Sequence, residues 1–236
     1  LLRFEKDEVV RVISNSYHVD EESGLVENER PLEFILSPQL DEEGVPYEGS
    51  EEKWRLIPEL AVAGIVPEGK ELNETKVKQV FGASARVKIA GVRRQPKPLT
   101  DKALMDKGFF LSQDFKRLFG NEGEAVIFLS DGTTYTLYFG EITYDEGLAL
   151  TAGGEGGGSK DGDATKANRY MFVSVRYEAA LDQGLPPHED RGEGALRGKE
   201  RVEQLRKRFE NWFYVIPNSS FRQIHKDYDE FWKDVK

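Results

Sequence analysis

The three histidines are the residues of this chain best suited to acid–base or metal chemistry near neutral pH. They are His18, His188 and His225, in a predicted strand, a proline-containing loop and a terminal helix. A zinc site or a serine–histidine pair would form only if the fold gathered them. The sequence therefore predicts no catalytic residue and no metal ligand.

Cysteines and carboxylates do not identify a reaction or a metal site either. The chain has no cysteine, which excludes disulfides, thiolate zinc sites, iron–sulfur clusters and cysteine nucleophiles. It has 43 acidic residues, so carboxylates paired as in glycosidases arise by chance. The acidic stretches 20–22, 41–43 and 48–52 lack the alternating ligands around a glycine turn that a calcium loop needs. They are predicted to be solvated loops.

A glycine-rich stretch covers residues 153–165, with the sequence GGEGGGSKDGDAT. It has neither the spacing nor the strand–helix context of a phosphate-binding loop, and Asp161 and Asp163 are only a fragment of a metal loop. We therefore predict no cofactor. The composition is typical of a flexible excursion between two strands, and its deletion should change stability little.

Arg93, Arg94 and Lys97 form the one basic cluster that we select as a possible interaction surface, in a predicted loop before Pro98. It could receive an acidic partner or lipid headgroups, or it could simply balance the charge of an acidic protein. The net charge of −10 opposes the phosphate backbone of nucleic acid, so we expect no nucleic-acid partner.

The first half of the chain reads mainly as strands. Leu2 and Phe4, followed by the apolar run 9–13, predict a hairpin around Lys6-Asp7, and 32–36 and 54–57 are two further strands. A helix should begin at Asn73, with Leu72 packed on Val77, and lead into a strand over 86–92.

The second half begins with a helix over 101–107, capped by Thr100 and ended by Gly108, and the core run 109–111. The segment 124–140 predicts a hairpin with a two-residue turn at Asp131-Gly132. It should place on one face Tyr135, Leu137 and Phe139. A strand over 169–177 follows.

The C-terminal region predicts a helix, a strand over 213–216 and a last helix. Apolar residues at helical spacing form one stripe of the first helix: Val202, Leu205, Phe209 and Trp212. We expect Trp212 to be a core residue. The last helix should start at Ser220 and carry Phe221, Ile224, Tyr228 and Phe231.

These elements predict an α+β fold, an antiparallel sheet or sheets built from hairpins with helices on one face. The length of 236 residues allows one larger domain or two smaller ones. We predict an N-terminal α+β subdomain over 1–98 and a C-terminal α+β subdomain over 99–236, related to each other, with the flexible insert at 153–165. The boundary falls in the proline-rich run 95–99.

Several segments, in this order, resemble the bacterial family known as domain of unknown function 4340. They are WRLIP at 54–58, LNETKVKQVFG followed by VKIAGVRRQPKPL, GFF at 108–110, NEGE followed by DGTTYTLYFGE, NRYMFVSVRYE, and RFENWFYVIPNSSFRQI. The resemblance covers most of the chain from Trp54 onward. The glycine-rich insert is similar to that of planctomycete-type members.

The resemblance implies an extracytoplasmic domain, held at the bacterial inner membrane by one N-terminal helix and associated with a gliding-type ABC transporter. No run of about 20 apolar residues is present, and the chain starts at Leu1-Leu2, so we expect that an anchoring segment has been removed. Two functions are compatible with the sequence, and we favour the first, which is not an enzyme. One is a non-enzymatic module that binds a partner protein, and the other is an enzyme or binding protein acting on envelope polysaccharide or peptidoglycan.

Overall fold

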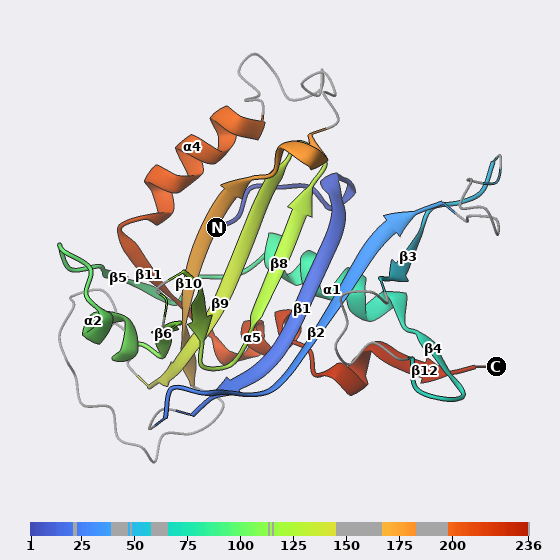
Figure 1. Ribbon diagram of the computed structural model, residues 1–236. Coiled ribbons are helices and arrows are strands. Elements are labelled where there is room, and N and C mark those ends of the chain that lie inside the picture. The colour runs from blue at the N-terminus through green and yellow to red at the C-terminus, as the bar shows by residue number, and fades with distance from the viewer. Residues whose placement is uncertain are drawn as a thin grey trace.

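The computed structural model describes residues 1–20, 23–38, 47, 49–57, 66–112, 114, 116–144, 167–182 and 198–235 (Figure 1). An antiparallel sheet with the strand order β3-β2-β1-β8-β9-β10-β11-β5 dominates this part of the chain. Its strands are β1 (Val9–Val19), β2 (Val26–Ser37), β3 (Lys53–Leu56), β5 (Gly91–Arg94), β8 (Glu124–Leu129), β9 (Thr133–Thr143), β10 (Asn168–Tyr177) and β11 (Trp212–Pro217). The predicted α+β class is confirmed.

Two short strand pairs flank the large sheet. β4 (Lys70–Leu72) pairs with β12 (Trp232–Asp234), which joins the C-terminal region to a segment in the first half of the chain. β6 (Phe109–Leu111) pairs with β7 (Leu118–Gly120). The predicted core position of Phe109 is confirmed, since its side chain is fully buried.

The longer helices cover one face of the sheet. They are α1 (Glu74–Ala85), α4 (Gly198–Phe209) and α5 (Asn218–Ile224), and in Figure 1 α1 and α5 pass behind the strands. Their apolar side chains form the main core with alternate residues of the strands. The short helix α2 (Asp101–Met105) packs with β6 and β11 in a second cluster that includes Leu104, Phe109 and Phe213.

Thr100 caps α2 as predicted, because its hydroxyl accepts a hydrogen bond from Ala103 N at 3.3 Å. Asn73 is also the N-cap of α1, but its side chain makes no capping hydrogen bond. The described residues also form short 3₁₀ helices, namely η1 (Lys6–Glu8), η3 (Ala179–Leu181) and η5 (Tyr228–Phe231).

The central hairpin lies where the sequence places it, but its turn is one residue longer. Phe128 is opposite Thr134, so Ser130, Asp131 and Gly132 form a three-residue loop. Gly132 has φ +79°, the conformation that the last position of such a loop requires. The predicted inner face is confirmed: Tyr135, Leu137 and Phe139 are fully buried.

Two predictions in the first half are wrong. No hairpin forms around Lys6-Asp7, because η1 occupies these residues and β1 pairs instead with β2 and β8. The strand predicted over 86–92 is β5, which starts only at Gly91. The amide groups of Arg86 and Val87 still donate to the carbonyls of Ala83 and Ser84, so these residues close the end of α1.

Two predictions in the C-terminal region are also wrong. The α4 helix ends at Phe209, so Trp212 begins β11 and is 36% exposed, outside the core. The last helix starts at Asn218 and stops at Ile224, where His225 takes up an extended conformation. Tyr228 and Phe231 therefore belong to η5. The predicted stripe of Val202, Leu205 and Phe209 is confirmed as buried.

The predicted boundary at residue 98 lies between β5 and α2, yet the large sheet contains strands from both sides of it. β5 pairs with β11, and β1 pairs with β8. The division into two subdomains stays a prediction. The glycine-rich insert 153–165 lies outside the described residues, between the paired strands β9 and β10.

Candidate functional site

The fold does not bring the two described histidines together into a reaction centre. His18 lies on β1 with half of its side chain exposed, 3.8 Å from Glu122. His225 follows α5 in the interior, and His188 lies outside the described residues. Within the part of the chain that the structure describes, no three potential ligands among His, Asp and Glu are grouped to hold a metal ion.

His225 is packed among aromatic rings. Its ring stacks on Phe221 at 4.9 Å between centroids and meets the edge of Phe139 at 5.9 Å. Its Nε2 is buried without a hydrogen-bond partner. Burial lowers the pKa of His225 to about 4, so the imidazole is neutral at pH 7.

Arg169 lies beside the same group of rings, with its Cζ atom 4.3 Å from the centroid of Phe221. Its side chain is 5% exposed, and Nη1 donates to the carbonyl of Gly140 at 2.6 Å. Burial lowers the pKa of Arg169, more than the neighbouring carboxylates of Glu122 and Glu141 raise it.

The predicted basic cluster is divided by the fold. Arg93 and Arg94 belong to β5 and not to a loop, so their side chains point to opposite faces. Arg93 is buried, whereas Arg94 and Lys97 are exposed. Of the selected residues, only Arg94 and Lys97 are thus placed to meet a partner directly.

The structure adds an aromatic side chain to this edge of the sheet. Trp212 lies directly opposite Arg94 in the β11–β5 register, so the two side chains share a face. The exposed Trp212 comes from a segment 118 positions further along the chain than Arg94. We call Arg94, Lys97 and Trp212 the β5 edge surface. The sequence did not identify Trp212 as a surface residue, because its spacing from Phe209 also fits the apolar stripe of α4.

A polar cluster on the face of the sheet opposite to that of Arg94 and Trp212 was also not predicted from the sequence. Oε1 of Glu29 and Oε1 of Glu124 both accept hydrogen bonds from Asn15 Nδ2, at 2.9 and 3.4 Å. Both also accept from Arg117 Nη2, at 2.9 and 3.1 Å. Asn15 and Glu124 are 109 residues apart, and only the β1–β8 register makes them neighbours.

The environment of this carboxylate pair is unusual. Burial raises the pKa of the Glu124 carboxyl, although Arg117 and Asn15 act in the opposite direction. The Tyr17 hydroxyl lies 3.4 Å from Oε2 of Glu124, and burial raises the pKa of this tyrosine too. Burial likewise raises the pKa of Tyr138, the register partner of Glu124 on β9, to about 12.

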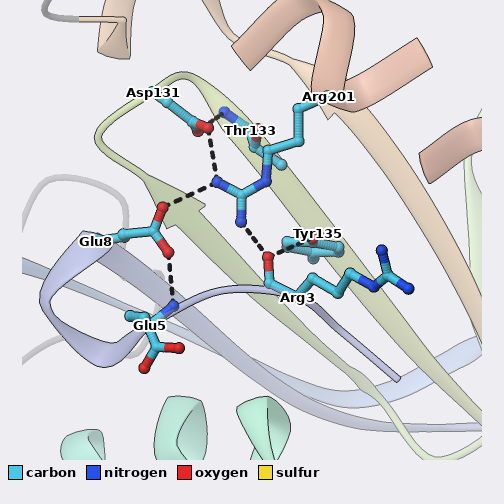
Figure 2. A network of polar contacts seen from close by, with 7 residues as sticks. All are labelled: Arg3, Glu5, Glu8, Asp131, Thr133, Tyr135 and Arg201. Atoms are coloured by element: carbon cyan, nitrogen blue, oxygen red, sulfur yellow. Dashed lines mark hydrogen bonds and ion pairs between the residues drawn. The ribbon is translucent and has the colours of Figure 1, made fainter. Parts of the chain in front are cut away.

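A third polar group joins α4 to the central hairpin (Figure 2). Arg201 Nη1 donates to Glu8 Oε1 at 2.9 Å and to Asp131 Oδ2 at 2.8 Å, and Nη2 donates to the carbonyl of Arg3. Burial alone would lower the pKa of Arg201, but Tyr135, Glu8 and Asp131 together raise it. Arg201 therefore keeps its positive charge, and its hydrogen bonds hold α4 against the central hairpin.

Comparison with known proteins gives no match: no protein-family model, no curated protein sequence and no solved structure is significantly similar to this chain. The resemblance to the domain of unknown function 4340 stays a prediction. None of the described helices is long and apolar enough to span a membrane.

Proposed function

We propose that this chain is a non-enzymatic protein-interaction module that contacts its partner through the β5 edge surface. The observation that carries this proposal is the exposed Trp212 opposite the exposed Arg94 at the edge of the sheet. Tryptophan and arginine are the side chains most enriched among residues that dominate binding energy in protein interfaces. A rigid strand pair presents both, which limits the entropy lost on binding.

The cellular setting is a further part of the proposal and rests on the family resemblance. The module belongs to a membrane-anchored, extracytoplasmic protein of the bacterial envelope, and its partner is a component of a gliding-type ABC transporter. It acts without a cofactor or metal.

Photo-crosslinking in the native membrane tests this function. A photoreactive amino acid replaces Glu210 in the full-length protein, because Glu210 is exposed and lies two residues before Trp212. The crosslinked partner is identified by mass spectrometry. Transporter components should be recovered, and the charge reversals Arg94→Glu and Lys97→Glu should abolish their crosslinking. The matched control is Lys53→Glu, because Lys53 is exposed on the opposite edge strand, β3. Equal crosslinking in all variants would contradict the proposed surface.

The carboxylate cluster favours a second candidate, an enzyme or binding protein acting on envelope polysaccharide or peptidoglycan. The observation that favours this candidate is the buried Glu124 beside a second carboxylate, Glu29. The raised pKa of Glu124 suits a general acid. The same contacts also make a structural ion pair that holds Arg117, next to β7, against the large sheet.

A fragment-release assay on purified peptidoglycan sacculi distinguishes the enzymatic role from the structural one. If the cluster is a reaction site, the chain should release soluble fragments, and Glu124→Gln and Glu29→Gln should each abolish release while leaving the protein folded. Glu51→Gln, at an exposed position, is the control. If no fragments are released and no sacculus-bound protein is recovered, the cluster is structural.

A further inference from the structure

We propose that β5 receives an extended acidic segment of a partner protein as an added strand of the sheet. This inference rests on the proposed interaction function and specifies its geometry. β5 is the last strand of the large sheet, and no described strand pairs with its outer edge. An open edge of this kind is a template for strand addition.

The hydrogen-bond register shows which backbone groups face outward. Gln95 N donates to Asn211 O at 2.9 Å, and Arg93 is opposite Phe213 two residues earlier. In an antiparallel pair the bonded residues alternate, so Gly91, Arg93 and Gln95 direct their amides and carbonyls toward β11. The amide groups of Val92 and Arg94 therefore point away from β11, toward the position of an added strand.

The charge of this edge selects an acidic occupant. From residue 86 to residue 97 the charged side chains are all basic: Arg86, Lys88, Arg93, Arg94 and Lys97. This segment is exceptional in a chain whose net charge is −10. A second copy of the chain, pairing β5 with β5, would bring these positive charges together, which is unfavourable.

The face shared by Arg94 and Trp212 indicates the side-chain pattern of the occupant. An added strand places alternate side chains on this face, next to Arg94 and within reach of Trp212. Carboxylates there can pair with Arg94, while β-branched residues favour the extended conformation. The best fit is a segment in which acidic and β-branched residues alternate.

The test uses a fluorescent eight-residue peptide of alternating glutamate and valine, with both ends blocked. We expect saturable binding by fluorescence anisotropy, and we expect hydrogen exchange of the Val92 and Arg94 amides to slow in the complex. A second peptide has the same side chains but carries N-methyl groups on alternate backbone nitrogens, on the edge that would pair. It should bind at least about tenfold more weakly, since strand addition requires those donors. A lysine–valine peptide should not bind.

Variants of the protein complete the test. Val92→Pro removes an outward amide that makes no bond to β11, a replacement that edge strands tolerate, and should weaken binding at least about tenfold without a large change in melting temperature. If this variant does not fold, the N-methylated peptide still decides the question.

The outcomes separate the two proposals. If Arg94→Glu and Trp212→Ala weaken peptide binding but N-methylation does not, the surface binds through side chains alone, and strand addition is wrong while the interaction function stands. If no acidic peptide binds up to about 1 mM, or the chain dimerises through β5, the inference is overturned. Failure of crosslinking at Glu210 in the native membrane would contradict the proposed function itself.

Discussion

His225 shows how a single buried side chain links stability to pH. In the unfolded chain its pKa is near the ordinary value of 6.5, whereas burial among Phe221, Phe139 and Gly123 lowers it to about 4. The folded state therefore binds fewer protons than the unfolded state between these values. The contribution of His225 is fully favourable above pH 6.5 and is lost as the pH falls toward 4.

This difference predicts that the free energy of unfolding falls by about 2 kcal/mol between pH 7 and pH 5 because of His225. Urea denaturation at both pH values measures it. In His225→Leu that part of the decrease should disappear, whatever the absolute stability of the variant. An unchanged pH dependence in His225→Leu would refute the assignment.

Trp212 and Phe209 give a second prediction at this scale. Phe209→Ala should cost about 3–5 kcal/mol, since its ring is 2% exposed and contacts Tyr135 and Tyr214. Trp212→Ala should cost about 1 kcal/mol or less, because its side chain is substantially exposed. Thermal and urea unfolding of both variants tests the order. A large loss of stability in Trp212→Ala would show instead that the Trp212 side chain is part of the core.

The same pair of residues shows why exposure was only partly predictable. A spacing of three residues from Phe209 to Trp212 is compatible with one helical stripe, and periodicity alone does not mark the residue at which α4 ends. The end depends on β11 pairing with β5 and β10, which are distant in sequence. Inward positions within an element were predictable, whereas positions at junctions depended on tertiary pairing.

At the scale of elements, the contacts between α4 and the central hairpin fix the position of the helix relative to the turn. Gly198 lies so close to the carbonyl of Asp131 that any Cβ there would overlap it. Arg201, one turn further along α4, reaches the Asp131 side chain and Glu8. A glycine and an arginine three residues apart thus set the distance between helix and turn.

We expect Arg201→Met to destabilise the protein by about 3 kcal/mol, because Glu8 and Asp131 lose a buried cation. The control is Lys102→Met, which removes an exposed ion pair with Asp106 and should cost about 0.5 kcal/mol or less. Urea denaturation at pH 7 compares the two. Similar small losses for both would show that the network of Figure 2 contributes little to stability.

Local patterns predicted most elements but not their partners. The hairpin at 124–140 was predictable because an aspartate–glycine turn lies between two alternating strands. By contrast, the Glu29–Glu124–Arg117 cluster and the β5 edge surface consist of residues brought together by strand order. The sequence alone singled out Arg94 and Lys97 as candidates, which stay a prediction, whereas Trp212 and Asn15 became candidates only through the register of β11 with β5 and of β1 with β8.

At the scale of the whole molecule, the two parts of the chain are interleaved. β5 precedes residue 98 but lies at the edge farthest from β1, β2 and β3, next to β11. β4 likewise pairs with β12 near the other end of the chain. Each fragment cut at residue 98 would therefore expose strand edges and apolar surface that the other fragment normally covers.

This arrangement predicts that fragments 1–98 and 99–236 do not fold independently, whereas their mixture reassembles. Each fragment alone should show little protection from hydrogen exchange at β5 and β11, and an equimolar mixture should regain the protection of the intact chain. The intact chain should unfold in one transition when measured by both far-UV and near-UV circular dichroism. If 99–236 alone keeps a cooperative transition and native protection in β8–β11, the boundary at residue 98 separates true subdomains, and β5 is an exchangeable addition to the second of them.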